Sequence, residues 1–246
     1  MIDASSQRTA ADSLNEFYWH GTATTSGQAA RVRTLVERES ITAGTAGFPL
    51  QLLHESGDPA LVASRLTLLE LGKGTRAWAW MQRLGDADVM RPLLFVMAFD
   101  LVVHSAFTEL GYGALCRSPN NPLMIDASLT NLAERFLPFT GKSLDIRAAL
   151  LGLIPPTLII SGACDIRTPR EVANEFVDTA PNATLLPARN HGHSALDTAP
   201  HFALAAIDRL ERPETTPDDL TSRRSAMARC LTARINLAKI LPKSLS

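Results

Sequence analysis

Two side chains near the end of the chain, Asp165 and His193, have the types and the setting for acid–base chemistry. Asp165 follows residues 157–161, a short apolar and β-branched run that predicts a strand buried on both faces of a parallel sheet. His193 follows a second such run, residues 183–187. Functional groups of open α/β sheets collect at the carboxyl ends of the strands. We therefore expect the carboxylate to fix the imidazole tautomer and stabilise its protonated form, as a hydrolytic triad requires.

The segment between these residues predicts a single β-α-β unit. Thr168 suits the N-cap of a helix, Pro169 suits its first turn, and Glu171 can close a capping box onto the Thr168 amide. A crossover of this kind is almost always right-handed and joins parallel strands. Residues 199–210 predict a closing helix.

Upstream of residue 150 the pattern is mostly helical, without strand–helix alternation. Gly57-Asp58-Pro59 predicts a turn, with Asp58 as the cap of a helix that runs to Gly72. Trp78 and Trp80 are expected to serve in packing rather than as a substrate platform. The apolar run 93–99 is either a buried strand or a buried helix, which periodicity cannot separate. Further predicted helices are residues 29–39, 75–84, 129–136 and 144–151, and residues 111–122 are predicted to form a loop.

Composition excludes some classes of function. The 246 residues are 46% hydrophobic and 20% charged, enough for a large core, and 24 Lys and Arg against 25 Asp and Glu give a net charge of −1. This balance does not favour a nucleic-acid partner. The N-terminus lacks the basic and apolar regions of a signal peptide, and no apolar run reaches a membrane span, so we expect a cytoplasmic protein, and a membrane partner is disfavoured. Cys116, Cys164 and Cys230 are spaced for neither a zinc site nor disulfides and are expected to be small buried hydrophobes.

Residues 156–162, followed by Asp165 and Thr168-Pro169, resemble the acid turn of alpha/beta-hydrolases, and Gly192-His193-Ser194 resembles their histidine turn. The separation of 28 residues and the order, acid before histidine, are also usual in that fold. The nearest match is the proline iminopeptidase and tripeptidyl aminopeptidase group. Phe48-Pro49-Leu50 and residues 54–61 resemble a segment of their cap domain, and the long helical stretch resembles their cap.

The resemblance implies an α/β protein with a partial alpha/beta-hydrolase fold. Residues 1–150 would be a mainly helical cap or lid, residues 151–212 the C-terminal part of the core with its parallel β-α-β unit and terminal helix, and residues 213–246 a basic extension. It also implies hydrolysis of peptide or ester bonds, with His193 as general base and acid and Asp165 as its orienter. His191, on the same turn, is the alternative histidine. No metal or organic cofactor is implied.

One part of the family pattern is missing. The nucleophile of these enzymes lies in G-x-S-x-G, and no serine of this sequence fits that pattern. Residues 192–196 and 141–145 come nearest, and both lack the second glycine. We therefore expect the C-terminal portion of a serine hydrolase, inactive alone. The alternatives are a peptide-binding pseudoenzyme module and one half of a split hydrolase that pairs with a separate N-terminal half.

Three further features are weaker. Asp100 and His104 lie one helical turn apart, and a solvated pair is favoured over a metal or acid–base pair. Asp100, Glu70 and Glu109 are candidate cap acids for a substrate amine, but no motif selects among them. The tail from residue 221 to 241 alternates basic and apolar residues. A solvated, frayed extension is favoured there over an amphipathic helix for an acidic surface or membrane.

Overall fold

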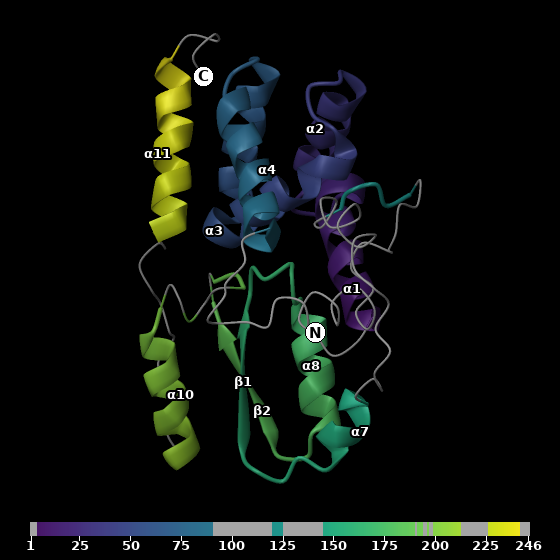
Figure 1. The fold of residues 1–246 in the computed structure, drawn as a ribbon, viewed down its shortest axis with the longest axis vertical. Helices are drawn as coiled ribbons and strands as arrows, with labels where there is room; N and C mark the ends of the chain where they lie inside the picture. Colours follow the sequence, from purple (N-terminus) through teal and green to yellow (C-terminus); the bar gives the residue numbers. More distant parts are fainter. Residues whose placement is uncertain are drawn as a thin grey trace.

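The computed structural model describes residues 4–90, 120–124, 145–189, 191–193, 196, 199–212 and 226–241. Its elements fall into two groups, which stand at opposite ends of the molecule in Figure 1. The first group is helical and comprises α1 (Ala4–Asn15), a π-helical turn η1 (Glu16–His20), α2 (Ser26–Glu37), α3 (Ala43–Glu70), α4 (Thr75–Met90) and α11 (Ala226–Ile240). The second contains the strands and comprises α7 (Ile146–Leu151), β1 (Thr157–Gly162), α8 (Arg170–Thr179), β2 (Ala183–Ala188) and α10 (His201–Glu211).

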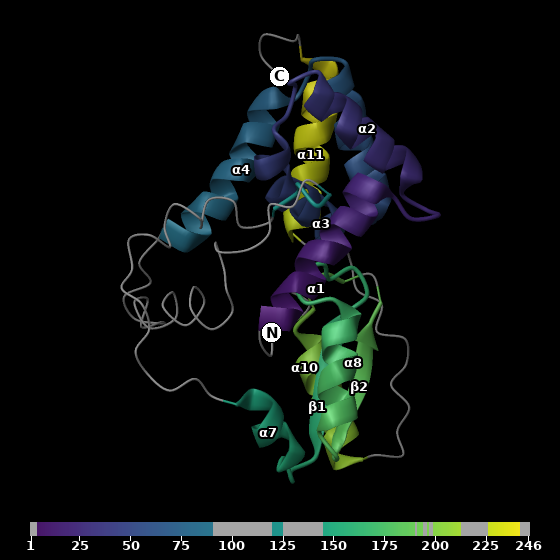
Figure 2. The ribbon, with the colours of Figure 1, turned by 90° about the vertical axis from the view of Figure 1, so that its right-hand side faces the viewer.

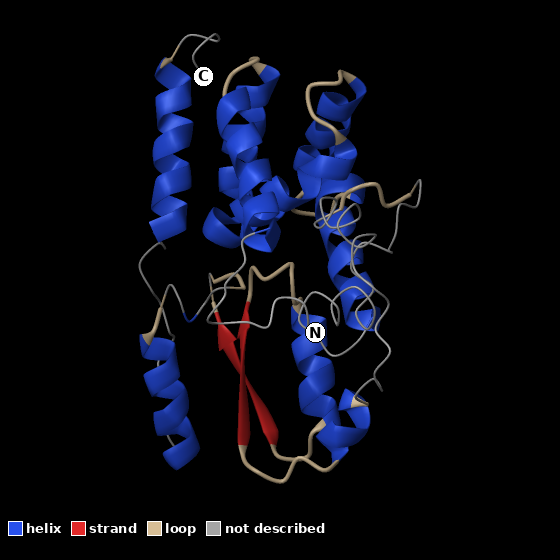
Figure 3. Cartoon of the chain, viewed as in Figure 1, coloured by secondary structure: helices blue, strands red, loops and turns tan. Residues whose placement is uncertain are grey.

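The predicted β-α-β unit is confirmed. Strands β1 and β2 pair in parallel, in a register that sets Thr157 against Ala183 and Gly162 against Ala188. Helix α8 covers one face of the sheet, and α10 packs against the other, where Ile160 of β1 packs against the cluster of Ala188, Ala199 and Phe202 (Figure 3, strands in red). The described part is therefore mostly helical with a small parallel sheet, which is compatible with a partial α/β fold.

The two edges of this sheet differ. The Thr157 amide donates to the Asn182 carbonyl at 3.0 Å, and the Ala163 amide donates to the Ala188 carbonyl at 3.0 Å. In a parallel ladder successive amides of a strand point alternately to its two sides. The Pro187 nitrogen therefore faces the outer edge of β2, where proline has no hydrogen to donate. The amide of Ile160 points instead to the opposite edge of β1. No strand in the described residues pairs with that edge.

Helix α8 begins differently from the prediction. Its N-cap is Pro169, and no side chain caps it, so the predicted capping box of Thr168 and Glu171 is wrong. The physical reason is competition, because the Thr168 hydroxyl donates to the Asp165 carboxylate instead of turning towards the helix.

Helix α3 runs without a break through Gly57-Asp58-Pro59, so the predicted turn there is also wrong. Leu53 before these residues and Val62 after them are both fully buried in the same core cluster. Burial of apolar side chains before and after Gly57-Asp58-Pro59 outweighs the low helix propensity of glycine and proline. Pro59 cannot donate to the Glu55 carbonyl, so one rung of the helical ladder is absent.

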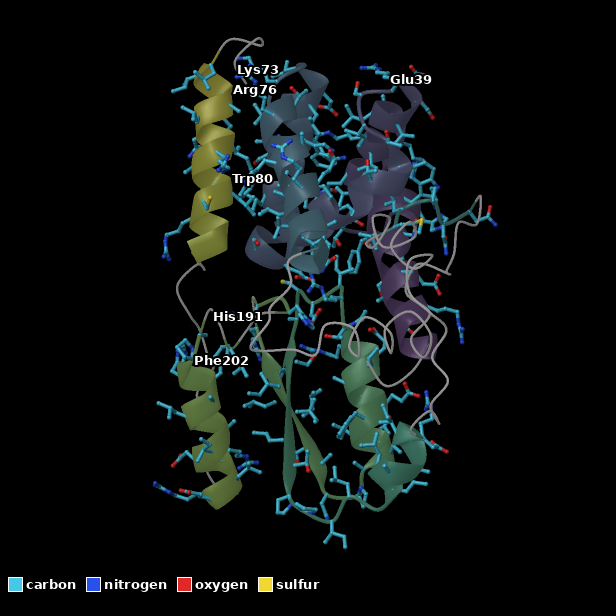
Figure 4. All side chains as sticks on the ribbon, in the orientation of Figure 1. Glu39, Lys73, Arg76, Trp80, His191 and Phe202 are labelled. Atoms are coloured by element: carbon cyan, nitrogen blue, oxygen red, sulfur yellow. The ribbon has the colours of Figure 1, made fainter. Side chains whose placement is uncertain are left out.

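The prediction of a frayed tail is wrong for residues 226–240. They form α11, which packs against α3 and buries Leu231, Ile235 and Ala238 (Figure 2). The Arg234 guanidinium stacks 3.9 Å from the ring centroid of Trp80, on the side of α4 nearest α11 (Figure 4). Trp78 is buried in the core, as the packing role predicts.

The predicted helices 29–39, 75–84, 144–151 and 199–210 correspond to α2, α4, α7 and α10. The predictions for residues 93–99 and 129–136, most of the loop 111–122, and Asp100, His104, Glu109 and Cys116 lie outside the described residues. Cys164 and Cys230 form no disulfide within the described residues, and both are only partly buried, not buried as predicted. None of the helices in the described ranges is long and apolar enough to cross a membrane.

Candidate functional site

The structure brings Asp165 and His193 together at the carboxyl ends of β1 and β2. Asp165 Oδ2 lies 3.2 Å from His193 Nδ1. The Asp165 side chain is 6% exposed, whereas the His193 side chain is 38% exposed. The carboxylate is therefore enclosed, and the imidazole that it contacts is accessible.

Thr168 is the second partner of the carboxylate. Its amide donates to Asp165 Oδ1 at 2.8 Å, and its hydroxyl donates to Asp165 Oδ2 at 2.6 Å. Burial raises the pKa of the Asp165 carboxyl, but the hydrogen bonds from His193 and Thr168 together outweigh burial, so its pKa lies below the ordinary value. Asp165 is consequently an anion at neutral pH, and its carboxylate accepts a hydrogen bond from the N–H of His193 Nδ1.

This arrangement assigns the imidazole tautomer. With the hydrogen on Nδ1, shared between Asp165 Oδ2 and Thr168 Oγ1 at 3.1 Å, Nε2 of His193 keeps its lone pair. Within the described residues Nε2 makes no hydrogen bond. An accessible imidazole with a free acceptor nitrogen and an anion behind it can act as a general base.

A close backbone contact joins the end of β1 and the acid turn to the histidine turn. The Cys164 amide donates to the His191 carbonyl at 2.8 Å. A Cβ at Gly162 would lie 2.4 Å from that carbonyl oxygen and 2.5 Å from the Gly192 carbonyl oxygen. Only glycine fits at this last residue of β1, because any side chain would collide with the backbone of the histidine turn.

His191 points elsewhere. Its side chain is buried, and its ring packs edge-on to Phe202 with centroids 4.8 Å apart (Figure 4). Burial lowers the pKa of His191, and the charge of His201 adds to this effect. Of the two histidines on this turn, His193 is therefore the one that meets the acid.

Glu55 of α3 also reaches this site, and the sequence reasoning missed it. Its Oε1 accepts from Gln51 Nε2 at 2.9 Å and from the Arg167 amide at 3.3 Å, a contact across 112 residues of sequence. Burial raises the pKa of Glu55, although the hydrogen bond from Gln51 opposes this. No local pattern around Glu55 signals a partner so distant in the chain.

Glu70, a candidate cap acid, lies at the far end of α3 and forms an ion pair with Arg31 at 2.6 Å. The hydrogen bond from Arg31 lowers the pKa of Glu70. In the part of the chain that the structure describes, no three His, Cys, Asp or Glu side chains are grouped to hold a metal ion. Comparison of the chain with protein-family models, curated proteins and solved structures gave no match.

Proposed function

We propose that this chain is the C-terminal portion of a serine hydrolase that resembles the proline iminopeptidases and related aminopeptidases, and that it acts on peptide or ester bonds. The observation that carries the proposal is the enclosed, anionic Asp165 held against Nδ1 of the accessible His193. Asp165 orients the imidazole and stabilises the imidazolium that forms during the reaction.

His193 performs the proton transfers. Its Nε2 removes the proton of a serine hydroxyl as the serine oxygen bonds to the acyl carbon of the substrate. The proton then passes from Nε2 to the leaving amine or alcohol as the acyl–nitrogen or acyl–oxygen bond breaks. Water repeats the sequence and releases the acid. The serine must come from a segment or chain outside this sequence, because no G-x-S-x-G is present.

The open edge of β1 supports the same proposal. The sheet has two strands in the described residues, and the unpaired β1 edge is suited to a further strand. Leu204, Ile207 and Leu210 of α10, which lie three residues apart, are also exposed and suited to further packing. A segment that carries the nucleophile would find both features on the strand-containing end of the molecule.

The test begins with the DNA immediately upstream of Met1, translated in all three frames and searched for G-x-S-x-G on a strand–turn–helix pattern. The joined chain is then expressed and assayed with amino-acid p-nitroanilides and p-nitrophenyl esters. We expect turnover that Asp165→Asn reduces by about 10⁴-fold and His193→Ala by about 10⁶-fold. His201→Ala, on the exposed side of the start of α10, is the matched histidine control and should retain activity.

Two results would overturn the proposal. Activity of the joined chain that survives His193→Ala would show that this histidine is not the base. Turnover by the isolated 246-residue chain, lost on His193→Ala, would show that no external nucleophile is needed.

A further inference from the structure

Helix α3 touches the acid turn through a side-chain acceptor. Glu55 Oε1 accepts from the Arg167 amide at 3.3 Å, and Arg167 lies two residues after Asp165 and one before Thr168. The same oxygen accepts from Gln51 Nε2, one helical turn earlier on α3, at 2.9 Å. Gln51 thereby limits the freedom of the Glu55 carboxyl and directs it at the acid turn.

Glu55 also meets the histidine turn, through the base of its side chain. A Cβ built on Gly192 would lie 2.4 Å from Glu55 Cβ and 2.9 Å from Glu55 Cα. Gly192 and Glu55 are therefore in direct contact, with no room for a side chain between them. Gly192 directly precedes His193, so the stem of Glu55 limits where the histidine can lie.

The position of Glu55 on α3 is itself fixed. The preceding residue, His54, is buried, and its Nδ1 is hydrogen-bonded to the buried Tyr18 hydroxyl at 2.7 Å. Leu53 is fully buried in the helical core. The helix segment that presents Glu55 is thus anchored to η1 and to the core before it reaches the site.

Charges from both turns surround the Glu55 carboxyl. Arg167 and Asp165 come from the acid turn, and His193 comes from the histidine turn. Arg167 and protonated His193 stabilise the carboxylate of Glu55, whereas Asp165 opposes it. Burial raises the pKa of Glu55 above its ordinary value, which fits a carboxyl enclosed between the two turns.

From these contacts we infer that Glu55 is a positioning residue for the Asp165–His193 pair. Its carboxyl holds the acid turn through the Arg167 amide, and its stem sets the distance of the histidine turn through Gly192. The helical region thereby fixes the geometry of two residues that lie more than a hundred positions away in sequence. The catalytic meaning of this role rests on the proposed function, whereas the geometric claim can be tested without it.

The test uses the full 246-residue chain and NMR, with no substrate. Two signals are measured: hydrogen exchange of the Arg167 amide, and the downfield proton on His193 Nδ1 that reports its hydrogen bond to Asp165. We expect Glu55→Ala to accelerate exchange of the Arg167 amide by about tenfold, as loss of one hydrogen bond predicts. We also expect it to shift the Nδ1 proton upfield, because the released acid turn carries Asp165 with it, whereas alanine keeps the Cα and Cβ atoms that contact Gly192.

Glu55→Gln is the conservative variant, because its amide oxygen can still accept from Arg167. We expect it to restore both signals, with exchange within about threefold of the parent chain. Glu70→Gln makes the same change on the same helix, 15 residues away at a described ion pair, and should alter neither signal. Glu55→Asp, which withdraws the carboxyl by one methylene group, replaces the alanine variant if that variant does not fold.

The inference is wrong if Glu55→Ala and Glu55→Asp leave both signals unchanged. It is also wrong if Glu55→Gln is as damaging as Glu55→Ala, because the acceptor oxygen would then not be what matters. Failure of the joined chain to turn over substrate would count against the proposed function alone, since neither NMR signal depends on turnover.

Discussion

Substitution of Gly162 by alanine should push the acid strand and the histidine turn apart. The added Cβ would lie 2.4 Å from the His191 carbonyl oxygen and 2.5 Å from the Gly192 carbonyl oxygen, whereas ordinary contact begins at 3.4 Å. The turn must therefore move by about 1 Å, and no side-chain rotation can relieve the clash because the opposing atoms are backbone. Overpacking of this kind costs about 1–3 kcal/mol of the free energy of unfolding. The same movement would stretch the 3.2 Å contact between Asp165 and His193 to about 4 Å, beyond a hydrogen bond.

Urea denaturation followed by circular dichroism gives the free energy of unfolding, and the His193 Nδ1 proton reports the hydrogen bond. Gly152→Ala is the matched control, because a Cβ there would find only the Ala149 carbonyl oxygen, at an ordinary 3.7 Å. We expect that control to change stability by no more than about 0.5 kcal/mol. Equal stability of the two variants, with the Nδ1 proton unchanged in both, would refute the close contact at Gly162.

Three further predictions concern stability. Leu231→Ala should lower the free energy of unfolding by about 2–4 kcal/mol, because Leu231 is 2% exposed at the interface between α11 and α3. Leu237→Ala, at a residue 52% exposed on the same helix, should change it by less than about 0.5 kcal/mol in the same urea titration. Equal losses in the two variants would contradict the packing of α11. The pKa of Asp165 is lowered in the folded state, so its contribution to stability is present above about pH 4 and is lost as the pH falls through the lowered pKa. The pKa of Glu55 is raised in the folded state, so its contribution is present below about pH 4 and is lost as the pH rises through the raised pKa. In unfolding free energies measured against pH, Asp165→Asn should therefore remove a loss on acidification and Glu55→Gln should remove a loss on raising the pH, and unaltered slopes would show that these groups are not the cause. Burial lowers the pKa of Arg65 to about 10 from 12.5, a cost of about 3 kcal/mol, and two of its nitrogens lack partners in the described residues. Arg65→Met should therefore raise the melting temperature. A fall would show that the hydrogen bond from Arg65 to the Gly74 carbonyl outweighs the cost of burial.

The β-α-β unit and the Asp165–His193 contact were predictable because each depends on local patterns. Two apolar runs with a helix between them can form parallel neighbours in few ways, and the ends of such strands meet. The helix start at Thr168 was not predictable from its motif, because the same hydroxyl serves either a cap or a nearby carboxylate, and only the fold decides between them.

The contacts that could not be predicted from the sequence join segments that are distant along the chain. The Glu55 carboxyl accepts a hydrogen bond from the Arg167 amide, 112 residues away in sequence, and no local sequence pattern around Glu55 predicts this partner. The apolar positions of residues 226–240 are spaced like those of many solvated or membrane-binding helices, so packing on α3 becomes evident only in three dimensions. The continuous α3 likewise depends on burial at Leu53 and Val62, which outweighs the local signal of Gly57-Asp58-Pro59.

Pro187 limits how copies of this chain can associate. Fibril growth by strand pairing needs two open edges on every molecule, so that each new copy offers a fresh edge to the next. Within the described residues no strand pairs with the β1 edge, whereas Pro187 interrupts the donors along the β2 edge. Two copies that pair through β1 consume the only fully open edges that the described sheet offers. We therefore expect any self-association through this sheet to favour a pair of molecules over a growing fibre.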